Sequence, residues 1–123
     1  LMDARLREGI RLFNDRQFFE CHEILEEFYR DSETENKAFL EGLIKLAAAF
    51  RMFVDFAEVK GSVRGIYQAL IRFENYQPAF LQVRVKELCA EAEAWAKAAE
   101  PPGATPSASN IPKIQLHRFS LFS

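Results

Sequence analysis

One segment of the sequence, residues 18–30, holds most of the side chains that could do chemistry. It contains four carboxylates, one of the two histidines and one of the two cysteines. At 100° per residue its apolar side chains form one stripe with the i, i+3, i+4, i+7 spacing of an amphipathic helix. His22 lies at the margin of this stripe, and Glu26 lies beside it one turn later. The stripe consists of Phe18, Cys21, Leu25, Phe28 and Tyr29, and the opposite face carries Glu20, Glu23, Glu27 and Arg30.

The spacing around His22 does not match familiar metal or nucleophile motifs. A zinc-protease helix needs a second His at the position of Glu26, and a di-iron carboxylate helix needs Glu where this chain has Phe19. The only other imidazole is His117. A His–Glu pair supplies two ligands where three or four are needed, so no metal and no other cofactor is expected. The neighbouring Cys21 is not expected to act as a nucleophile, because its side chain diverges from that of His22 by about 100°.

Two interpretations of His22 remain open. We expect its side chain to be buried and hydrogen-bonded, either to Glu26 or to a polar group of the next helix. It can then be a packing residue of the core, or a ligand or catalytic group. The acidic face beside it is expected to be mainly solvated, with a polar partner site shared with Arg51 or Arg64 as the alternative. The candidate binding residues are Glu20, His22, Glu23, Glu26, Glu41 and Arg51.

Composition narrows the class of protein. With 123 residues the chain predicts one domain, long enough to bury a core without disulfide or metal staples. A net charge of −2 and a pI near 5.7 argue against nucleic-acid binding. Two cysteines on predicted apolar faces are typical of free thiols in a reducing compartment, and no secretory signal is visible at Leu1-Met2-Asp3. These features predict a cytoplasmic protein.

Charge is unevenly distributed along the chain. Residues 20–41 hold eight acids and two bases, a net charge of −6, whereas residues 42–86 hold seven bases and three acids, a net charge of +4. The two segments can pack together and partly neutralise each other. Alternatively, they can border a polar cleft.

The apolar spacing predicts helices throughout the domain and no strands. One long apolar segment, residues 38–57, carries four charges and therefore reads as a central core helix and not as a membrane span. Polar turns or Pro78 separate the segments. The expected helices are 3–13, 18–30, about 37–57, a fourth that opens at Gly61-Ser62 and closes at Asn75, and about 82–99.

Short turns make consecutive helices antiparallel neighbours, which predicts an all-α, five-helix bundle of two helix hairpins plus a capping helix. Residues 18–28 and 63–73 share their apolar spacing at an offset of 45 residues, a weak echo of the tetratricopeptide helix-turn-helix plan. Any two amphipathic helices can share this spacing, and two units are too few for a solenoid. A compact bundle is therefore favoured.

The composition changes abruptly after residue 99. Residues 1–99 form the expected helical bundle domain, and the Pro-, Ser- and Ala-rich residues 100–110 form a linker. Residues 111–123 are apolar again and are expected to dock on the bundle or on a partner as an extended segment. The apolar side chains of this expected tail are Ile111, Ile114, Leu116, Phe119 and Phe122.

Three stretches resemble a known family, the bacterial and archaeal domain of unknown function 309. They are Leu12-Phe13-Asn14, the Phe-Glu-x-His-Glu-x-x-Glu element that begins at Phe19, and residues 39–49 with a Leu-x-Gly-Leu-Ile core. Gly65, Leu70 and Tyr76-x-Pro78 also fit, so the resemblance spans about residues 6–99. The chain departs from the pattern at Glu41 and Lys45, where the family usually has Gln, and at Phe28, where Trp is common. The resemblance implies a small helical bundle and a candidate site, but no established activity.

Two classes of function are consistent with these features. The first is a non-enzymatic interaction module with a polar His/Glu site on its second helix, which binds a protein partner or forms a homodimer. The second is a metal- or small-molecule-binding enzyme that uses His22 and Glu26 as ligands or as an acid–base pair. The many phenylalanines and the apolar tail favour the interaction module, with neither nucleic acid nor membrane as partner.

Overall fold

A computed structural model describes residues 1–117 of the chain, and it is all-α as expected. Five helices follow one another, joined by short connections, with one 3-10 turn before the fifth helix and another after it. Residues 1–117 contain no strand, only isolated bridges from Val83 to Phe80 and Leu116. The helices are α1 (Ala4–Asn14), α2 (Phe18–Arg30), α3 (Thr34–Phe56), α4 (Val59–Phe73) and α5 (Val85–Ala99), and the 3-10 turns are η1 (Glu74–Tyr76) and η2 (Ala108–Asn110).

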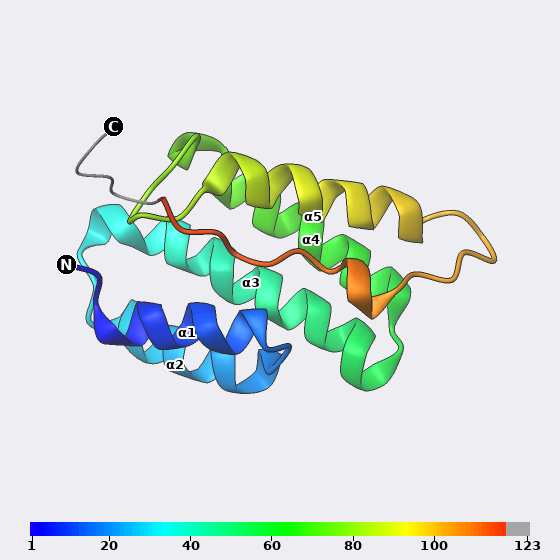
Figure 1. Ribbon diagram of the computed structural model, residues 1–123, viewed down its shortest axis with the longest axis horizontal. Helices are drawn as coiled ribbons and strands as arrows, with labels where there is room; N and C mark the ends of the chain where they lie inside the picture. The colour runs from blue at the N-terminus through cyan, green and yellow to red at the C-terminus, as the bar shows by residue number, and fades with distance from the viewer. Residues whose placement is uncertain (118–123) are drawn as a thin grey trace.

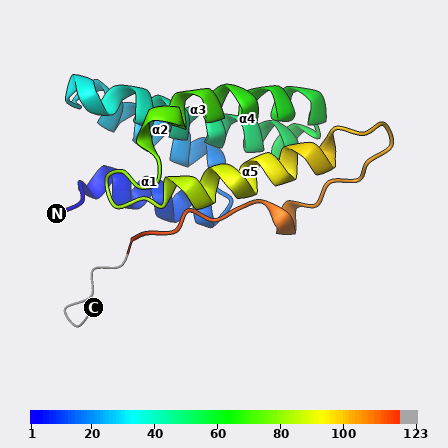
Figure 2. The same cartoon turned by 90° about the horizontal axis from the view of Figure 1, so that it is seen from above.

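The helices form two layers, with consecutive helices packed on each other (Figure 1). One layer consists of α2, α3 and α4, with the long α3 between its neighbours. The other contains α1 and α5 (Figure 2), which lie apart from each other, as Figure 1 shows. Between them, the segment that follows η2 runs across α3. Helix hairpins α1–α2 and α3–α4, with α5 packed on α4, confirm the predicted arrangement.

Aromatic side chains at the expected inward positions build the core. Phe50 on α3 is fully buried at its centre. Its ring centroid lies 6.0 Å from that of Phe13, 5.9 Å from Phe18 and 5.3 Å from Trp95. These separations are those of favourable aromatic pairs, which add to the free energy of apolar burial. One residue therefore joins α3 to α1, α2 and α5.

Small residues let α3 and α4 approach closely. A Cβ added at Gly65 would lie 2.8 Å from the Cβ of Ala49, nearer than side chains pack. Glycine is needed here for space, because the main chains of the two helices would otherwise be forced apart. This contact fixes the position of the C-terminal half of α3.

Three helix starts differ from the sequence prediction. α3 begins at Thr34 and not near Lys37, and α4 begins at Val59, so Gly61 lies inside it. α5 begins at Val85 and not near Gln82. The turns before α4 and α5 use non-glycine residues with positive φ, Ala57 at 54° and Leu81 and Gln82 at 47° and 68°. Their side chains give no turn signal, so the boundaries could not be placed from residue type.

The segment after α5 contributes to the interior. Ile111 and Ile114 are 3% and 4% exposed and belong to the same apolar cluster as the helices. The indole Nε1 of Trp95 donates to the carbonyl oxygen of Ser107 at 3.0 Å. Phe119 and Phe122, which belong to the expected tail, lie outside the described residues. Among the helices of residues 1–117, none is long and apolar enough to cross a membrane.

Candidate functional site

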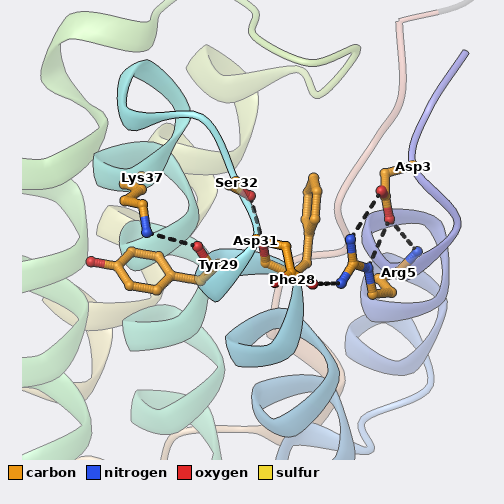
Figure 3. Close-up of polar contacts among 7 residues, drawn as sticks. All are labelled: Asp3, Arg5, Phe28, Tyr29, Asp31, Ser32 and Lys37. Atoms are coloured by element: carbon orange, nitrogen blue, oxygen red, sulfur yellow. Dashed lines mark hydrogen bonds and ion pairs between the residues drawn. The ribbon is translucent and has the colours of Figure 1, made fainter.

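α2 carries most of the candidate residues, and its C-terminal end is fixed by α1 (Figure 3). Arg5 on α1 donates from Nη1 to Asp31 Oδ2 at 2.6 Å, and its guanidinium lies 5.2 Å from the centroid of the Phe28 ring. The same guanidinium bonds Asp3 and holds the pKa of that carboxyl below its usual value. A cation at this position is also favourable for the helix dipole.

Two further side chains satisfy carbonyl groups at the same end of α2. Ser32 Oγ donates to the carbonyl oxygen of Phe28 at 2.6 Å, and Lys37 Nζ donates to that of Tyr29 at 3.1 Å (Figure 3). The last four carbonyls of a helix have no partners within it, so these bonds stabilise the end of α2. Lys37 also lies 4.5 Å from the centroid of the Tyr29 ring. α2 is therefore held firmly between α1 and α3.

His22 differs from its prediction. Nε2 of His22 lies 3.6 Å from Oε1 of Glu26, which is an ion-pair distance when the imidazole is protonated. The two side chains are 33% and 48% exposed, and neither donates nor accepts a side-chain hydrogen bond within residues 1–117. The expectation of a substantially buried histidine therefore holds only in part, since His22 is half-buried, and the expected hydrogen bond to Glu26 or to the next helix was wrong. His22 is turned about 100° away from the buried Cys21, which places it at the edge of the stripe and in contact with water.

The acidic face of α2 is solvated, as expected. Glu20, Glu23 and Glu27 are all exposed. Within the described chain, none of the three forms an ion pair with Lys or Arg. These carboxylates therefore remain available to a partner of opposite charge.

The other two candidate residues, Glu41 and Arg51, lie on α3. Glu41 accepts from Nε of Arg72 on α4 at 2.7 Å, so it faces away from α2. This bond joins the acidic and basic segments of the sequence, as the neutralisation interpretation requires. Arg51, near the other end of α3, bonds Asp55 at 3.2 Å. The six candidate residues therefore do not converge on one cleft.

Arg51 organises a surface feature that the sequence analysis missed. Its guanidinium carbon lies 4.5 Å from the centroid of the Phe19 ring and 5.1 Å from that of Phe56. Phe19 and Phe56 are 41% and 60% exposed. We call this cluster the aromatic patch. It consists of Phe19, Arg51 and Phe56.

A signal for part of this patch was present in the sequence. Phe19 falls outside the apolar stripe of its helix, since it is turned about 100° from Phe18. A large aromatic side chain on a polar helix face is less common than one in the core. The meeting of Phe19 with Arg51 could not be predicted, because it depends on how α2 and α3 cross.

Neither thiol is suited to nucleophilic chemistry. Burial raises the pKa of Cys21 to about 12. Burial, with a smaller contribution from Glu93, raises the pKa of Cys89 to about 11. Both side chains are therefore protonated near neutral pH, whereas reactivity requires the thiolate. Within residues 1–117, no group of three or more His, Cys, Asp or Glu side chains has an arrangement that could hold a metal ion.

Comparison with known families places this helix arrangement in context. Residues 6–64 match the family described as Domain of unknown function (DUF309). The match covers α1, α2, α3 and the start of α4, so the resemblance seen in the sequence is confirmed for this part of the chain. The later residues that also fitted the pattern, from Gly65 to Pro78, lie outside the matched range. No curated protein matches the chain.

Proposed function

We propose that this chain is a non-enzymatic interaction module that binds a protein partner through the aromatic patch. The observation that carries this proposal is the contact of the Arg51 guanidinium with two exposed phenylalanine rings. Aromatic and arginine side chains are enriched at the centres of protein interfaces. Of the five large apolar side chains that are exposed in the described residues, two, Phe19 and Phe56, lie in this one cluster.

The side chains of the patch already contact one another in the isolated chain. Asp55 holds Nε of Arg51, and the guanidinium plane then supports both rings. Side chains that are already held in place lose less entropy on association, which favours affinity. Covering the rings would also remove exposed apolar surface from water, at about 25 cal/mol per Å².

The acidic face of α2 adjoins the patch and limits the kind of partner. Glu20 and Glu23 follow Phe19 within the next turn of the helix, and the polar pair of His22 and Glu26 extends the same rim. A partner that presents basic side chains around an apolar residue would complement this surface. Such complementarity mainly increases the association rate and the specificity. We propose a second copy of the chain or another protein as that partner.

Capture experiments with matched variants test this function. The variant Phe19→Ser/Phe56→Ser removes both rings, and Ile71→Ser removes an apolar side chain on α4 that is as exposed as Phe56. We expect immobilised wild-type protein and Ile71→Ser to retain the same specific partner from an extract of the source organism, and the double variant to lose it. Sedimentation velocity of the purified chain distinguishes a second copy from another protein. Equal retention by all three proteins would contradict the proposal.

A charge reversal tests the proposed rim. Glu23→Lys should weaken binding about tenfold at low salt and much less at high salt, because exposed charges are screened within about 10 Å at 0.1 M ionic strength. Glu87→Lys, an exposed reversal on α5, is the matched control. If the two reversals have the same effect, the acidic face of α2 is not part of the contact surface.

A further inference from the structure

A groove between α1 and α5 already holds a peptide, which is the chain's own tail. Residues 111–117 lie in it without helical structure (Figures 1 and 2). At its far end the main chain pairs with the connection before α5. Arg84 donates its N–H to the carbonyl oxygen of Gln115 at 2.9 Å, and the N–H of His117 donates to the carbonyl oxygen of Gln82 at 2.7 Å.

The side chain of Asn14 forms two hydrogen bonds with the main chain of this segment. Its Nδ2 donates to the carbonyl oxygen of Ile114 at 3.1 Å, and its Oδ1 accepts from the N–H of the same residue at 2.7 Å. Two bonds to one residue fix the direction and register of the peptide. Both bonds involve only main-chain atoms of the peptide, so an extended segment of another sequence can form them if it has an N–H at this position.

Arg16, from the turn that follows α1, binds the main chain of the tail nearer its N-terminal end. Arg16 donates from Nη2 to the carbonyl oxygen of Ile111 at 2.6 Å, and from Nη1 to that of Pro112 at 3.3 Å. Asn14 ends α1, and Arg16 has a positive φ of 64° in the turn that follows. The α1–α2 turn thus directs both side chains towards the groove.

Selectivity for the peptide comes from its alternating side chains. Ile111, Pro112 and Ile114 are buried, Leu116 is half-buried, and Lys113 and Gln115 are exposed. Pro112, Ile114 and Leu116 alternate with the exposed Lys113 and Gln115, because an extended segment presents alternate side chains to the same side, and Ile111 is buried in addition. Together the buried positions define a sequence pattern. That pattern is Ile-Pro-x-Ile-x-Leu, in which x is exposed.

We infer that this groove is a peptide-binding site and that its occupant in trans is the same tail of a second copy of the chain. The site goes beyond the proposed function, because it lies in the other layer of the fold from the aromatic patch. Every contact described above would be equally available to an identical segment of another copy. The connecting residues 100–110 can span about 36 Å when extended, which is enough to reach a neighbouring molecule. Exchange of a terminal segment between copies is a known route to dimers.

Cleaving the connection tests whether the groove binds a separate peptide. A protease site inserted after Gly103, where the chain is exposed, retains all residues while freeing the tail. The probe is a fluorescent peptide with the sequence of residues 107–117. We expect the cleaved protein to bind it at least tenfold more tightly than the uncleaved protein, in which the tethered tail competes at a high effective concentration. Equal binding to both forms, or no exchange of the cleaved tail, would overturn the inference.

Matched variants of the cleaved protein test the hydrogen bonds between Asn14 and the main chain of the peptide. Asn14→Ala should weaken peptide binding about tenfold, because two hydrogen bonds are lost. Asp15→Ala is the control, since Asp15 is exposed and, among residues 1–117, its side chain bonds only Arg11. A peptide with Ile114→Glu should not bind. Equal affinities of the two protein variants for the peptide would show that Asn14 does not contribute to binding it.

Complementing full-length chains test exchange between copies. Ile114→Glu has an intact groove and a defective tail, whereas Asn14→Ala has an intact tail and a defective groove. We expect the mixture to form a one-to-one complex by sedimentation velocity, and each chain alone to form less of it. If Ile114→Glu does not fold alone, the peptide of residues 107–117 should restore its circular dichroism. Failure of both the complex and the rescue would refute tail exchange, and the capture test of the aromatic patch would be unaffected.

Discussion

Replacing Ile114 by Ala tests how much the tail contributes to the stability of the bundle. The side chain is 4% exposed and lies in the groove between α1 and α5. Truncation removes about three methylene equivalents, each stabilising by about 0.8 kcal/mol when buried, or about 2.4 kcal/mol in all. A rigid cavity would raise this cost towards about 5 kcal/mol. Because the tail can instead leave the groove, the loss cannot exceed the free energy with which the tail binds.

We therefore expect Ile114→Ala to lower the free energy of unfolding by about 2 to 3 kcal/mol. Urea unfolding followed by circular dichroism measures this value, and at an m-value of about 2 kcal/mol per M the midpoint should fall by about 1 M. Lys113→Ala is the control, because its side chain is exposed on the neighbouring residue. If the two variants unfold within about 0.5 kcal/mol of each other, the tail is not bound as described.

Three further outcomes follow from the structure. His22→Ala should change the free energy of unfolding by less than about 0.5 kcal/mol, because a surface ion pair contributes little; a loss of about 2 kcal/mol in thermal unfolding would show that His22 is buried. Gly65→Leu should destabilise by at least about 1 to 3 kcal/mol through its clash with Ala49, whereas Ala38→Leu at an exposed position of α3 should not. The raised pKa values of Cys21 and Cys89 keep both thiols protonated at pH 8, so Ellman's reagent should react slowly until guanidinium is added, and a fast thiol in the folded protein would contradict their burial.

Much of the fold could be predicted from the sequence because apolar periodicity reports burial directly. Apolar residues with helical spacing are buried on α1, at Leu6, Ile10 and Phe13, and on α5, at Val85, Leu88, Ala92, Trp95 and Ala99. α4 fits less closely, since Val63 and Leu70 are only half-buried. Its outer side has no further helix to pack against within the described residues.

The candidate site was less predictable, because it depends on how helices cross. Periodicity correctly predicted that Glu20 and Glu23 are exposed. It predicted too much burial for His22, which lies at the margin of the apolar stripe. The link between Glu41 and Arg72 joins residues 31 positions apart, and no local pattern indicates it. The same holds for Arg51 and the two rings that it supports.

Asn14 shows the same limit in the tail groove. In the sequence it reads as turn chemistry between α1 and α2. In the structure its side chain bonds a residue 100 positions later. A polar side chain at a helix end usually serves its own backbone, so its long-range partner could be found only from the folded chain.

Hydrogen–deuterium exchange with and without the partner tests the central claim most directly. If the aromatic patch is the contact surface, binding should slow exchange of amides in the first turn of α2, around Phe19 to Glu23, and in the last turns of α3, around Arg51 to Phe56. If the partner is a second copy of the chain, exchange is compared between a dilute sample, in which the chain is free, and a concentrated sample, in which it is bound. Slower exchange confined to α4 and α5, or no change in either region, would contradict the proposed function.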